Sequence, residues 1–573
     1  MVSIVIPCWN QMEYTQQCLE SIQAYTPEDH EIIFVDNGST DYTESYIKVE
    51  MLSHPNYKLL RNEENLGFPK ACNQGANLAE GEYLLFLNND VVVSKDWLTG
   101  LLDCIKSSSD IGCVGPMTNC ISGRQQIKSD ESYDTIFKYQ MFAETYRKAH
   151  RGLYIPFYRI VGFCMLTKRE LFTEHWGFDE RFSPGNFEDD DYCLRLTRAG
   201  YRNVIAGDVF VHHHGSKSHD LSSYNDLLKT NQKKYEEKWN ELIGTGISAV
   251  MIVRDEESYI HWCLKNLSEQ VDEIIVVDTG SKDATKALAS EFPKVKIYDF
   301  EWCDDFSAAR NFANSKATQP WILSIDADEV ITGLDKINLH PWYAYRIETR
   351  NYTNNPRYAT SKENTGEYPR HEKGKRWFPS TKARLFPNDP RIKFDFPVHE
   401  VVEDSCYYWG CGMVNCPDTI VHHYGRLNDN YEYGHGDKYY ALLHKQLESG
   451  KNEKRSLEQL AIAAQGLGKY TEARDFWQKL LKIEPESNTA FLNMGHCYAE
   501  EGQWNEAREW SEKAVRASPE SRDAQMNFAT CLAMTGEPDK CIEICKDLAS
   551  KYPDYPLPQS LMNALTIGGN NGN

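Results

Sequence analysis

Two stretches of this chain carry the same ordered series of short motifs, and this internal repeat constrains the fold more than any other feature of the sequence. The strand-like run at 2–6 returns at 247–251, and the Val-Asp-x-Gly-Ser motif at 35–39 returns at 277–281. Three more motif pairs follow in the same order, at 71–73 and 309–311, 87–90 and 325–328, and 211–215 and 421–425. Because the order is kept while the spacing shortens, we expect two consecutive copies of one fold whose loops differ in length.

Short apolar runs alternate with amphipathic stretches in both copies, which is the pattern of a mostly parallel sheet covered by helices. A different repeat follows. Gly468, Gly502 and Gly536 recur about 34 residues apart, the period of tetratricopeptide repeats, which the segment 452–553 therefore resembles. The sequence thus predicts a first α/β domain, a second α/β domain, an all-α repeat domain and a disordered tail, at 1–243, 244–435, 436–567 and 568–573 respectively.

Composition and charge limit the class of protein. The 573 residues exceed what one hydrophobic core supports, and 62 Lys and Arg against 84 Asp and Glu give a net charge of −22, which disfavours binding to nucleic acid. No apolar run approaches the roughly 18 residues of a membrane span. The chain opens on a strand-like segment instead of a signal peptide. We therefore expect a cytoplasmic protein without a transmembrane segment.

The 17 cysteines are an odd number without a Cys-x-x-Cys pair, so reduced thiols are expected. Cys406, Cys411 and Cys416 precede His422 and His423, which raises the alternative of a zinc site. Their spacing fits no standard ligand pattern, and partly buried thiols are the favoured interpretation.

Acidic residues gather where apolar strands are expected to end, and ligands bind beyond the carboxyl ends of parallel strands. Asp36 and Asp278 each stand shortly before a Gly-Ser pair, where an ordinary helix cap is the alternative. The runs 88–90 and 326–328 end a later strand in each copy. Carboxylates at these points would hold a hard divalent cation that neutralises a pyrophosphate.

These motifs make residues 1–430 similar to the family 2 glycosyltransferases, which have the GT-A fold. In the first copy the likeness rests on Ile6-Pro7 and on the motifs at 35–41, 65–68, 88–90, 177–180 and 187–191. The resemblance implies two tandem, Rossmann-like GT-A domains and an inverting transfer of sugar from a nucleotide-diphosphate sugar, with a UDP-sugar as the first choice. It also implies a divalent metal, Mn²⁺ or Mg²⁺, as cofactor.

The resemblance assigns three roles in the first copy. Asp36 would contact the nucleobase, Asp90 would bind the metal, and Asp189 would deprotonate the acceptor. Metal binding rests mainly on Asp90, because Asn88 replaces the first Asp of the Asp-x-Asp form. The further catalytic candidates, whose alternative role is interaction with a helix dipole, are Glu188 and Asp191.

Two larger sets complete the predicted sites. The residues expected to bind nucleotide sugar are Pro7, Asp36, Asn37, Ser39, Asn65, Gly67, Asn73 and Asn89 in the first copy and Arg254, Asp278, Thr279, Ser281, Arg310 and Asp326 in the second. The residues expected to bind metal are Asp90, His212 and His213 in the first copy and Asp328 and His423 in the second. For the histidines, burial or exposure without a metal is the alternative.

The second copy resembles a different branch of the family, one that includes peptide-modifying transferases joined to tetratricopeptide repeats. The matching motifs lie at 253–256, 305–311, 325–329 and 398–400. This copy lacks the acid motif of the first. Its catalytic base is predicted as Glu400, with Glu329 in reserve and a structural role for Glu400 as the alternative.

The leading hypothesis is a bifunctional glycosyltransferase that modifies a protein acceptor, or a glycan being built on it, docked on the curved surface of the repeats. A transferase that builds a lipid-linked or surface polysaccharide is the second hypothesis. The third is a repeat-domain scaffold with one inactive transferase copy. The retained acids in both copies favour an enzyme, and the sequence leaves open whether the chain forms an oligomer.

Overall fold

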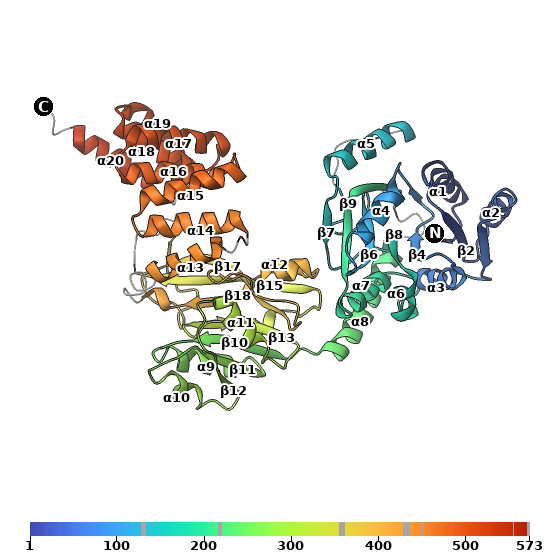
Figure 1. Cartoon of the computed structure of the whole chain (residues 1–573), viewed down its shortest axis with the longest axis horizontal. Helices are drawn as coiled ribbons and strands as arrows, with labels where there is room; N and C mark the ends of the chain where they lie inside the picture. The colour runs from blue at the N-terminus through green and yellow to red at the C-terminus, as the bar shows by residue number, and fades with distance from the viewer. Residues whose placement is uncertain are drawn as a thin grey trace.

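The computed structural model describes the chain except residues 128–132, 134, 216–220, 355–360, 428–435, 449, 451, 554 and 570–573. Two α/β domains and a stack of helices follow one another along the chain (Figure 1). The helix α8 (Leu221–Ile243) ends the first α/β domain, and α13 (Gly436–Glu448) begins the helical stack. Within the described residues, no helix is long and apolar enough to span a bilayer.

The first α/β domain is built on a 9-stranded sheet with the order β3-β2-β1-β4-β8-β6-β9-β5, and β7 pairs with β9. Strands β1 to β4 are parallel, whereas β8 runs antiparallel to β4. The strands are β1 (Val2–Cys8), β2 (His30–Asp36), β3 (Tyr57–Arg61), β4 (Tyr83–Leu87), β5 (Val91–Val92), β6 (Ile111–Thr118), β7 (Tyr154–Pro156), β8 (Cys164–Lys168) and β9 (Arg202–His213). The helices before α8 are α1 (Met12–Tyr25), α2 (Thr43–Met51), α3 (Phe68–Leu78), α4 (Trp97–Lys106), α5 (Ile136–Ala149), α6 (Arg169–Glu174) and α7 (Glu188–Arg198).

The second α/β domain repeats the main order of this sheet as β12-β11-β10-β13-β17-β15-β18-β14, but its ninth strand, β16, pairs with β17, the counterpart of β8. The strands are β10 (Ile247–Val253), β11 (Glu273–Asp278), β12 (Val295–Asp299), β13 (Trp321–Ser324), β14 (Glu329–Thr332), β15 (Tyr343–Thr353), β16 (Lys362–Glu363), β17 (Arg376–Pro387) and β18 (Gly412–His423). The helices are α9 (Ile260–Ser268), α10 (Thr285–Ala289), α11 (Phe306–Asn314) and α12 (Glu403–Tyr408). The predicted pair of similar, mostly parallel α/β domains is confirmed.

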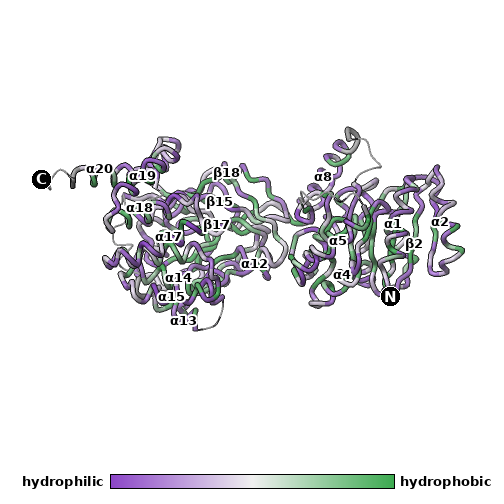
Figure 2. Tube along the Cα trace, turned by 90° about the horizontal axis from the view of Figure 1, so that it is seen from above, coloured by the Kyte–Doolittle hydropathy of each residue, from purple (hydrophilic) through white to green (hydrophobic). Residues whose placement is uncertain are grey.

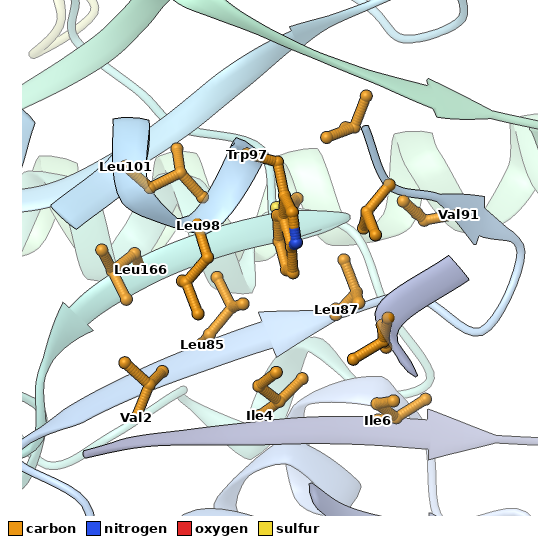
Figure 3. Packing of buried hydrophobic residues seen from close by; sticks show 14 of the residues in the cluster. Val2, Ile4, Ile6, Leu85, Leu87, Val91, Trp97, Leu98, Leu101 and Leu166 are labelled. Carbon is orange, nitrogen blue, oxygen red and sulfur yellow. The ribbon is translucent and has the colours of Figure 1, made fainter. Parts of the chain in front are cut away.

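The central strand β1 is buried on both faces, because helices cover both sides of the sheet. Val2, Ile4 and Ile6 point to the side of α4, where they pack in one cluster with Trp97 (Figure 3). Val5 points the other way and belongs to a second cluster. This sandwich of helices and strands fixes the strand ends at which the predicted site residues lie.

The helical domain stacks consecutive helices in pairs, and Figure 1 shows them as a continuous pile. After α13 the helices are α14 (Glu453–Gly466), α15 (Tyr470–Ile483), α16 (Asn488–Glu500), α17 (Trp504–Ala517), α18 (Arg522–Met534), α19 (Pro538–Lys551) and α20 (Leu557–Gly569). The predicted all-α repeat domain is confirmed. The tail at 568–573 was predicted to be disordered, but its first two residues belong to α20, which continues to Gly569. Its remainder, 570–573, lies outside the described residues.

Candidate active sites

The same carboxylate and imidazole meet at one edge of both sheets. Asp90 follows β4, and Val91 of β5 lies opposite His213 at the end of β9. This register places His213 Nε2 3.2 Å from Asp90 Oδ1. In the second domain β14 pairs with β18 in the same way, and His423 Nε2 lies 3.1 Å from Asp328 Oδ2. The short strands β5 and β14 therefore build one Asp-His pair in each domain.

The second ring nitrogen of each histidine faces an oxygen that can only accept a hydrogen bond. His213 Nδ1 lies 2.8 Å from the Cys120 carbonyl oxygen, and His423 Nδ1 lies 2.8 Å from Asn351 Oδ1. Nδ1 must therefore carry the hydrogen, and in the neutral ring the Nε2 lone pair faces a carboxylate. Two such atoms come this close only around a shared proton or cation.

The Asp-His pairs fit a divalent cation. Burial lowers the pKa of His213, but the Asp90 carboxylate outweighs burial and raises it above its ordinary value, and Asp328 does the same for His423. A cation between the two side chains would likewise relieve the repulsion between the Nε2 lone pair and the carboxylate. The oxygen that accepts from Nδ1 would hold the ring in orientation. In the part of the chain that the structure describes, no three His, Cys, Asp or Glu side chains form a group that could hold a metal ion. A cation bound at either Asp-His pair would thus have two ligands from these pairs.

The neighbouring histidines point to the opposite face of their strands. His212 Nδ1 lies 2.8 Å from the Tyr133 hydroxyl, and His422 Nδ1 lies 2.8 Å from the Tyr352 hydroxyl. Burial lowers the pKa of His212 to about 4 and that of His422 to about 3. Of the two histidines predicted to bind metal in the first domain, the structure brings His213 to the carboxylate and packs His212 among aromatic rings.

The three evenly spaced cysteines of the second domain are packed thiols. Cys406 and Cys411 belong to one hydrophobic cluster, whereas Cys416 packs against another. All three are free. The structure therefore does not gather them into a zinc site.

Asp36 and Asp278 end β2 and β11 and accept hydrogen bonds from the turns that follow. Asp36 Oδ1 accepts from the Ser39 amide at 3.0 Å. The Asp278 carboxylate accepts from the Gly280 amide at 3.2 Å and from the Ser281 amide at 3.1 Å. Each carboxylate is thereby held at the edge of the sheet where the nucleotide sugar is predicted to bind.

The two domains differ in the charge beside this carboxylate. Arg61 lies opposite Asp36 on β3, contacts its carboxylate and lies 3.3 Å from Glu44. The corresponding strand position of the second domain is Asp299, which pairs with Lys286 at 2.5 Å. The strand residue of the neighbouring ion pair is therefore a cation in the first domain and an anion in the second, and the helix residue that pairs with it has the opposite charge in each case. Arg61 lies outside the repeated motifs, so only a position-by-position alignment of the two copies contains this reversal.

Several residues predicted to bind nucleotide sugar hold the loops around the sites. The Asn73 side chain donates to the Phe178 carbonyl at 2.8 Å and accepts from the Phe178 amide at 2.9 Å. Asn311 makes the same two bonds with Phe394. Further bonds of this kind join Asn37, Asn65 and Gly67, Asn89 and Thr15, and Thr279 and Val253. Pro7 lies within β1, and Arg254 directly follows β10.

The acid motif of the first domain starts α7 and fixes the predicted base. Asp189 Oδ2 accepts from the Gly162 amide at 2.8 Å, and Asp189 Oδ1 accepts from the Asp190 amide at 2.9 Å. These two backbone donors hold the carboxylate, and each oxygen keeps a second lone pair that can accept a proton.

The other two candidates of this motif have different surroundings. Glu188 is 5% exposed, its Oε2 atom has no hydrogen-bond partner among the described residues, and burial raises its pKa well above the ordinary value. Asp191 is fully buried. It accepts from Arg195 Nε at 2.9 Å, Lys238 Nζ at 2.5 Å and Trp239 Nε1 at 3.1 Å. The bonds of Asp191 tie α7 to α8 and give this residue a packing role.

Arg310 links two predicted residues of the second site. Its Nε donates to Glu400 Oε1 at 2.6 Å, and its Nη2 donates to Asp326 Oδ1 at 2.7 Å. Burial raises the pKa of Asp326, but Arg310, Arg384 and Lys382 together outweigh burial and lower it. Glu329 is buried and receives hydrogen bonds of 2.8 and 2.6 Å from Arg384. Both candidates are held in ion pairs, but the Glu329 side chain is only 3% exposed and that of Glu400 is 15% exposed, so Glu400 stays the first candidate for the base.

Glu256 stands in the motif at 253–256, but the sequence motifs assign it no role in the second site. It lies directly beyond β10, and burial together with the charges of Asp328 and Asp326 raises its pKa to about 8. Gln11 occupies the corresponding position of the first domain. An alignment extended past the repeated strand would have shown this acid in the second copy only.

The loop that carries Glu400 lies against the repeat domain. Val398 is 1% exposed and belongs to the hydrophobic core of the repeats. Arg455 of α14 donates from Nη2 to the His399 carbonyl at 2.9 Å, and Tyr439 of α13 stacks on the His399 ring with centroids 6.4 Å apart. The first helices of the repeat domain therefore support the loop of the second site.

Comparison with known sequences identifies the family. The family described as Glycosyl transferase family 2 matches residues 3–176 and 248–397, together more than half of the chain. The chain belongs to this family. Tetratricopeptide repeats match at 455–487, 489–521 and 523–555. Both predicted resemblances are confirmed.

Curated relatives and solved structures are similar to parts of the chain. Glycosyltransferase AglE of Haloferax volcanii is 33% identical over 230 residues, which are 40% of this chain and 69% of AglE. A TPR repeat-containing protein of Synechococcus elongatus is 37% identical over 32% of this chain, and the O-antigen biosynthesis protein RfbC of Myxococcus xanthus is 29% identical over 38%. The chain spans only 44% and 17% of these two relatives. The mannosyltransferase PcManGT of Pyrobaculum calidifontis, solved with GDP-Man and Mn²⁺, is 20% identical, with a TM-score of 0.32 over 42% of this chain and 64% of PcManGT.

Proposed function

We propose that each α/β domain transfers a sugar from a nucleotide-diphosphate sugar, a UDP-sugar in the first place, to an acceptor. The observation that carries the proposal is the Asp-His pair, which recurs at the same register of both sheets as Asp90 with His213 and Asp328 with His423. A pair repeated at the edge where α/β sheets bind ligands supports two active sites over one site and an inactive copy.

In this proposal the Asp-His pairs hold Mn²⁺ or Mg²⁺. The bound cation supplies positive charge that neutralises the departing diphosphate. The carboxylates of Asp36 and Asp278, which the turn amides hold in place, bind the nucleoside part of the donor. Donor binding and cation binding thus lie at the same edge of each sheet, beyond β2 and β4 in the first domain and beyond β11 and β13 in the second, with one strand between them.

Asp189 is the proposed base of an inverting reaction in the first domain. Its carboxylate takes the proton of the acceptor hydroxyl while the hydroxyl oxygen bonds to the sugar and the nucleotide leaves from the opposite face. Burial raises the pKa of Glu188 beside it well above the ordinary value, which favours its uncharged form and weakens the repulsion of a second negative charge next to the base. In the second domain, Glu400 takes the same role beside Arg310.

The proposed acceptor is a protein, or a glycan being built on one, and the repeat domain binds it. The contacts of Val398 and His399 with the repeats support this, because an acceptor held there would lie close to the loop of Glu400. The similarity to RfbC, named for O-antigen biosynthesis, favours a surface polysaccharide as the second candidate acceptor. The free thiols suit a reaction in the reducing cytoplasm.

Single substitutions separate the two proposed activities. Asp90→Ala should abolish donor turnover by the first domain, and Asp328→Ala should abolish turnover by the second. The measurement is release of nucleoside diphosphate by the full-length chain from a panel of nucleotide sugars, before and after chelation and with Mn²⁺ restored. Loss of all turnover in either single variant would contradict two independent sites. Full turnover after exhaustive chelation would contradict the metal requirement.

A further inference from the structure

The two α/β domains meet in an aromatic seam, formed by Tyr158 and Tyr235 of the first domain and His340, Trp342 and Tyr343 of the second. Figures 1 and 2 show the first domain as a lobe that meets the rest of the chain on the side where α12 lies. The Tyr158 ring centroid lies 5.4 Å from that of Trp342 and 5.6 Å from that of Tyr343. Tyr235 stacks on His340 with centroids 5.6 Å apart.

Trp342 is part of the hydrophobic core of the first domain, although its chain segment belongs to the second. Its side chain is 3% exposed and lies in the same cluster as Phe182, Tyr192 and Tyr235. Tyr158 and Tyr343 pack against this cluster from its edge. The second domain therefore completes a core that the first domain does not fill with its own residues.

A short segment leads from the seam to the acid motif. Arg159 follows Tyr158, and its Nη1 atom lies 3.4 Å from the Asp190 carboxylate. Three residues further on, Gly162 donates its amide to Asp189 at 2.8 Å. The segment from Tyr158 to Gly162 thus touches the second domain at one end and the proposed base at the other.

A second route passes through α8. Tyr235 packs on Phe187, the residue before the acid motif, with ring centroids 5.5 Å apart. Phe187 has a φ of 76°, a left-handed conformation that a bulky residue keeps only where its surroundings impose it. One turn earlier on α8, Asn231 donates to the carbonyls of Phe182 and Gly185 at 2.6 and 2.8 Å. The aromatic seam therefore supports the helix that holds this loop.

We propose that Trp342 is a positioning residue for the first active site: through the aromatic seam, the second α/β domain holds Asp189 in place for transfer by the first. The inference rests on the proposed function of the first domain. Weakening the seam should lower turnover there without weakening donor binding, because Asp36 and Asp90 lie on other strand ends. The two domains are then coupled through packing, although each has its own donor site.

The test uses the full-length chain with Asp328→Ala, so that the remaining turnover belongs to the first domain. Adding Trp342→Ala should lower kcat at least about tenfold and leave the Kd of the donor within about twofold, and Trp342→Phe should recover part of the loss. The milder His340→Ala should lower kcat in the same direction. Trp377→Ala is the matched control, because Trp377 is buried in a separate cluster of the second domain.

Hydrogen exchange gives a readout that does not depend on activity. Peptides that cover 157–162 and 186–191 should exchange faster in the seam variants and keep the parent rate in the Trp377→Ala control. A parent without any turnover would refute the proposed function. An active parent with unchanged kcat and exchange in both seam variants would overturn the positioning role. An equal loss of kcat in the Trp377→Ala control would overturn the positioning role too. If Trp342→Ala does not fold, the result for His340→Ala decides whether the positioning role holds.

Discussion

Asp189 and Asp191 lie two residues apart on α7, yet their surroundings give them different parts. Asp189 accepts hydrogen bonds from the backbone amides of Gly162 and Asp190, which leave each of its oxygens a lone pair for a proton. Asp191 is enclosed by two cations, Lys238 and Arg195, each of which bonds one of its oxygens. The motif thus combines a proposed catalytic residue with a residue that has a packing role, and the sequence alone does not distinguish the two.

Asp189→Asn should separate chemistry from binding. Asn keeps the size of the side chain but cannot accept the acceptor proton, so kcat of the first domain should fall about a hundredfold or more. Donor affinity should stay nearly constant, since Asp36 and Asp90 are untouched. Turnover and calorimetric titration with the donor measure the two quantities. A near-normal kcat would move suspicion to Glu188, the neighbouring acid.

Asp191→Ala should act on stability. Removing this carboxylate takes one partner from each of two cations, but Lys238 keeps Asp179 and Arg195 keeps two backbone carbonyls, so the free energy of unfolding should fall by about 1 to 3 kcal/mol. Denaturant unfolding of the full-length chain measures this loss. Glu144→Ala, which removes an exposed pair with Lys148 on α5, is the control and should leave the unfolding curve almost unchanged. Equal curves for both variants would contradict the packing role.

The sequence predicts individual site residues better than their partnerships. His213 was predicted together with His212, because only the register with β5 decides which of two successive side chains reaches the carboxylate. Arg310 and Glu400 were each predicted, yet 90 positions separate them and only the fold joins them. Glu256 was assigned no role because its counterpart is a glutamine, and the comparison of the copies relied on matching residues.

At the scale of elements, one buried glutamate ties the strands together at the edge opposite the first site. Glu31 of β2 accepts from the Ser3 hydroxyl of β1 at 2.6 Å and from the Glu80 amide before β4 at 2.7 Å. Lys58 of β3 lies 2.8 Å from the same carboxylate. One side chain thus contacts β1, β3 and the segment before β4. It helps to fix the register of these strands, on which the position of the site residues at the other edge depends.

The second sheet repeats this device with other residues. Glu273 accepts from the Ser248 hydroxyl at 2.6 Å and from the Thr318 amide at 2.8 Å, and Lys296 lies 2.5 Å away. Burial raises the pKa of Glu273, but these partners outweigh burial and lower it from 4.5 to about 2. The sequence contains both glutamates at matching strand starts, but their partners are too scattered to predict.

Glu273→Gln should change how stability depends on pH. Because the folded pKa lies below the unfolded one, the carboxylate stabilises the fold above about pH 4.5, and this contribution is lost as pH falls toward 2. The variant should be less stable at neutral pH, by about 1 to 3 kcal/mol. Its stability should also fall less steeply in that acid range. Unfolding at a series of pH values, with the exposed Glu269→Gln as control, measures both effects, and parallel curves for wild type and variant would refute the assignment.

For the whole molecule, the repeated motifs predict two similar domains and a repeat domain, because each motif marks a strand end or a helix turn within one domain. How the domains pack is another matter. Trp342 directly precedes β15 of the second domain. The structure buries it in the first domain. Such contacts carry no periodicity, so only the assembled chain shows that the second domain supports the first site.

The repeat domain should matter for the second site in the same way. Arg455 donates to the His399 carbonyl and lies 4.6 Å from the Phe396 ring, and both of these loop residues have left-handed backbones. Arg455→Ala should free the loop, displace Glu400 and lower second-domain turnover about tenfold. First-domain turnover, measured on the same chain, should stay unchanged. Arg516→Ala, which removes an exposed ion pair on α17, is the matched control. If Arg455→Ala lowered both activities equally, the repeats would act only as a general support of the fold. If it lowered neither, they would act on the second site only as a distant docking surface.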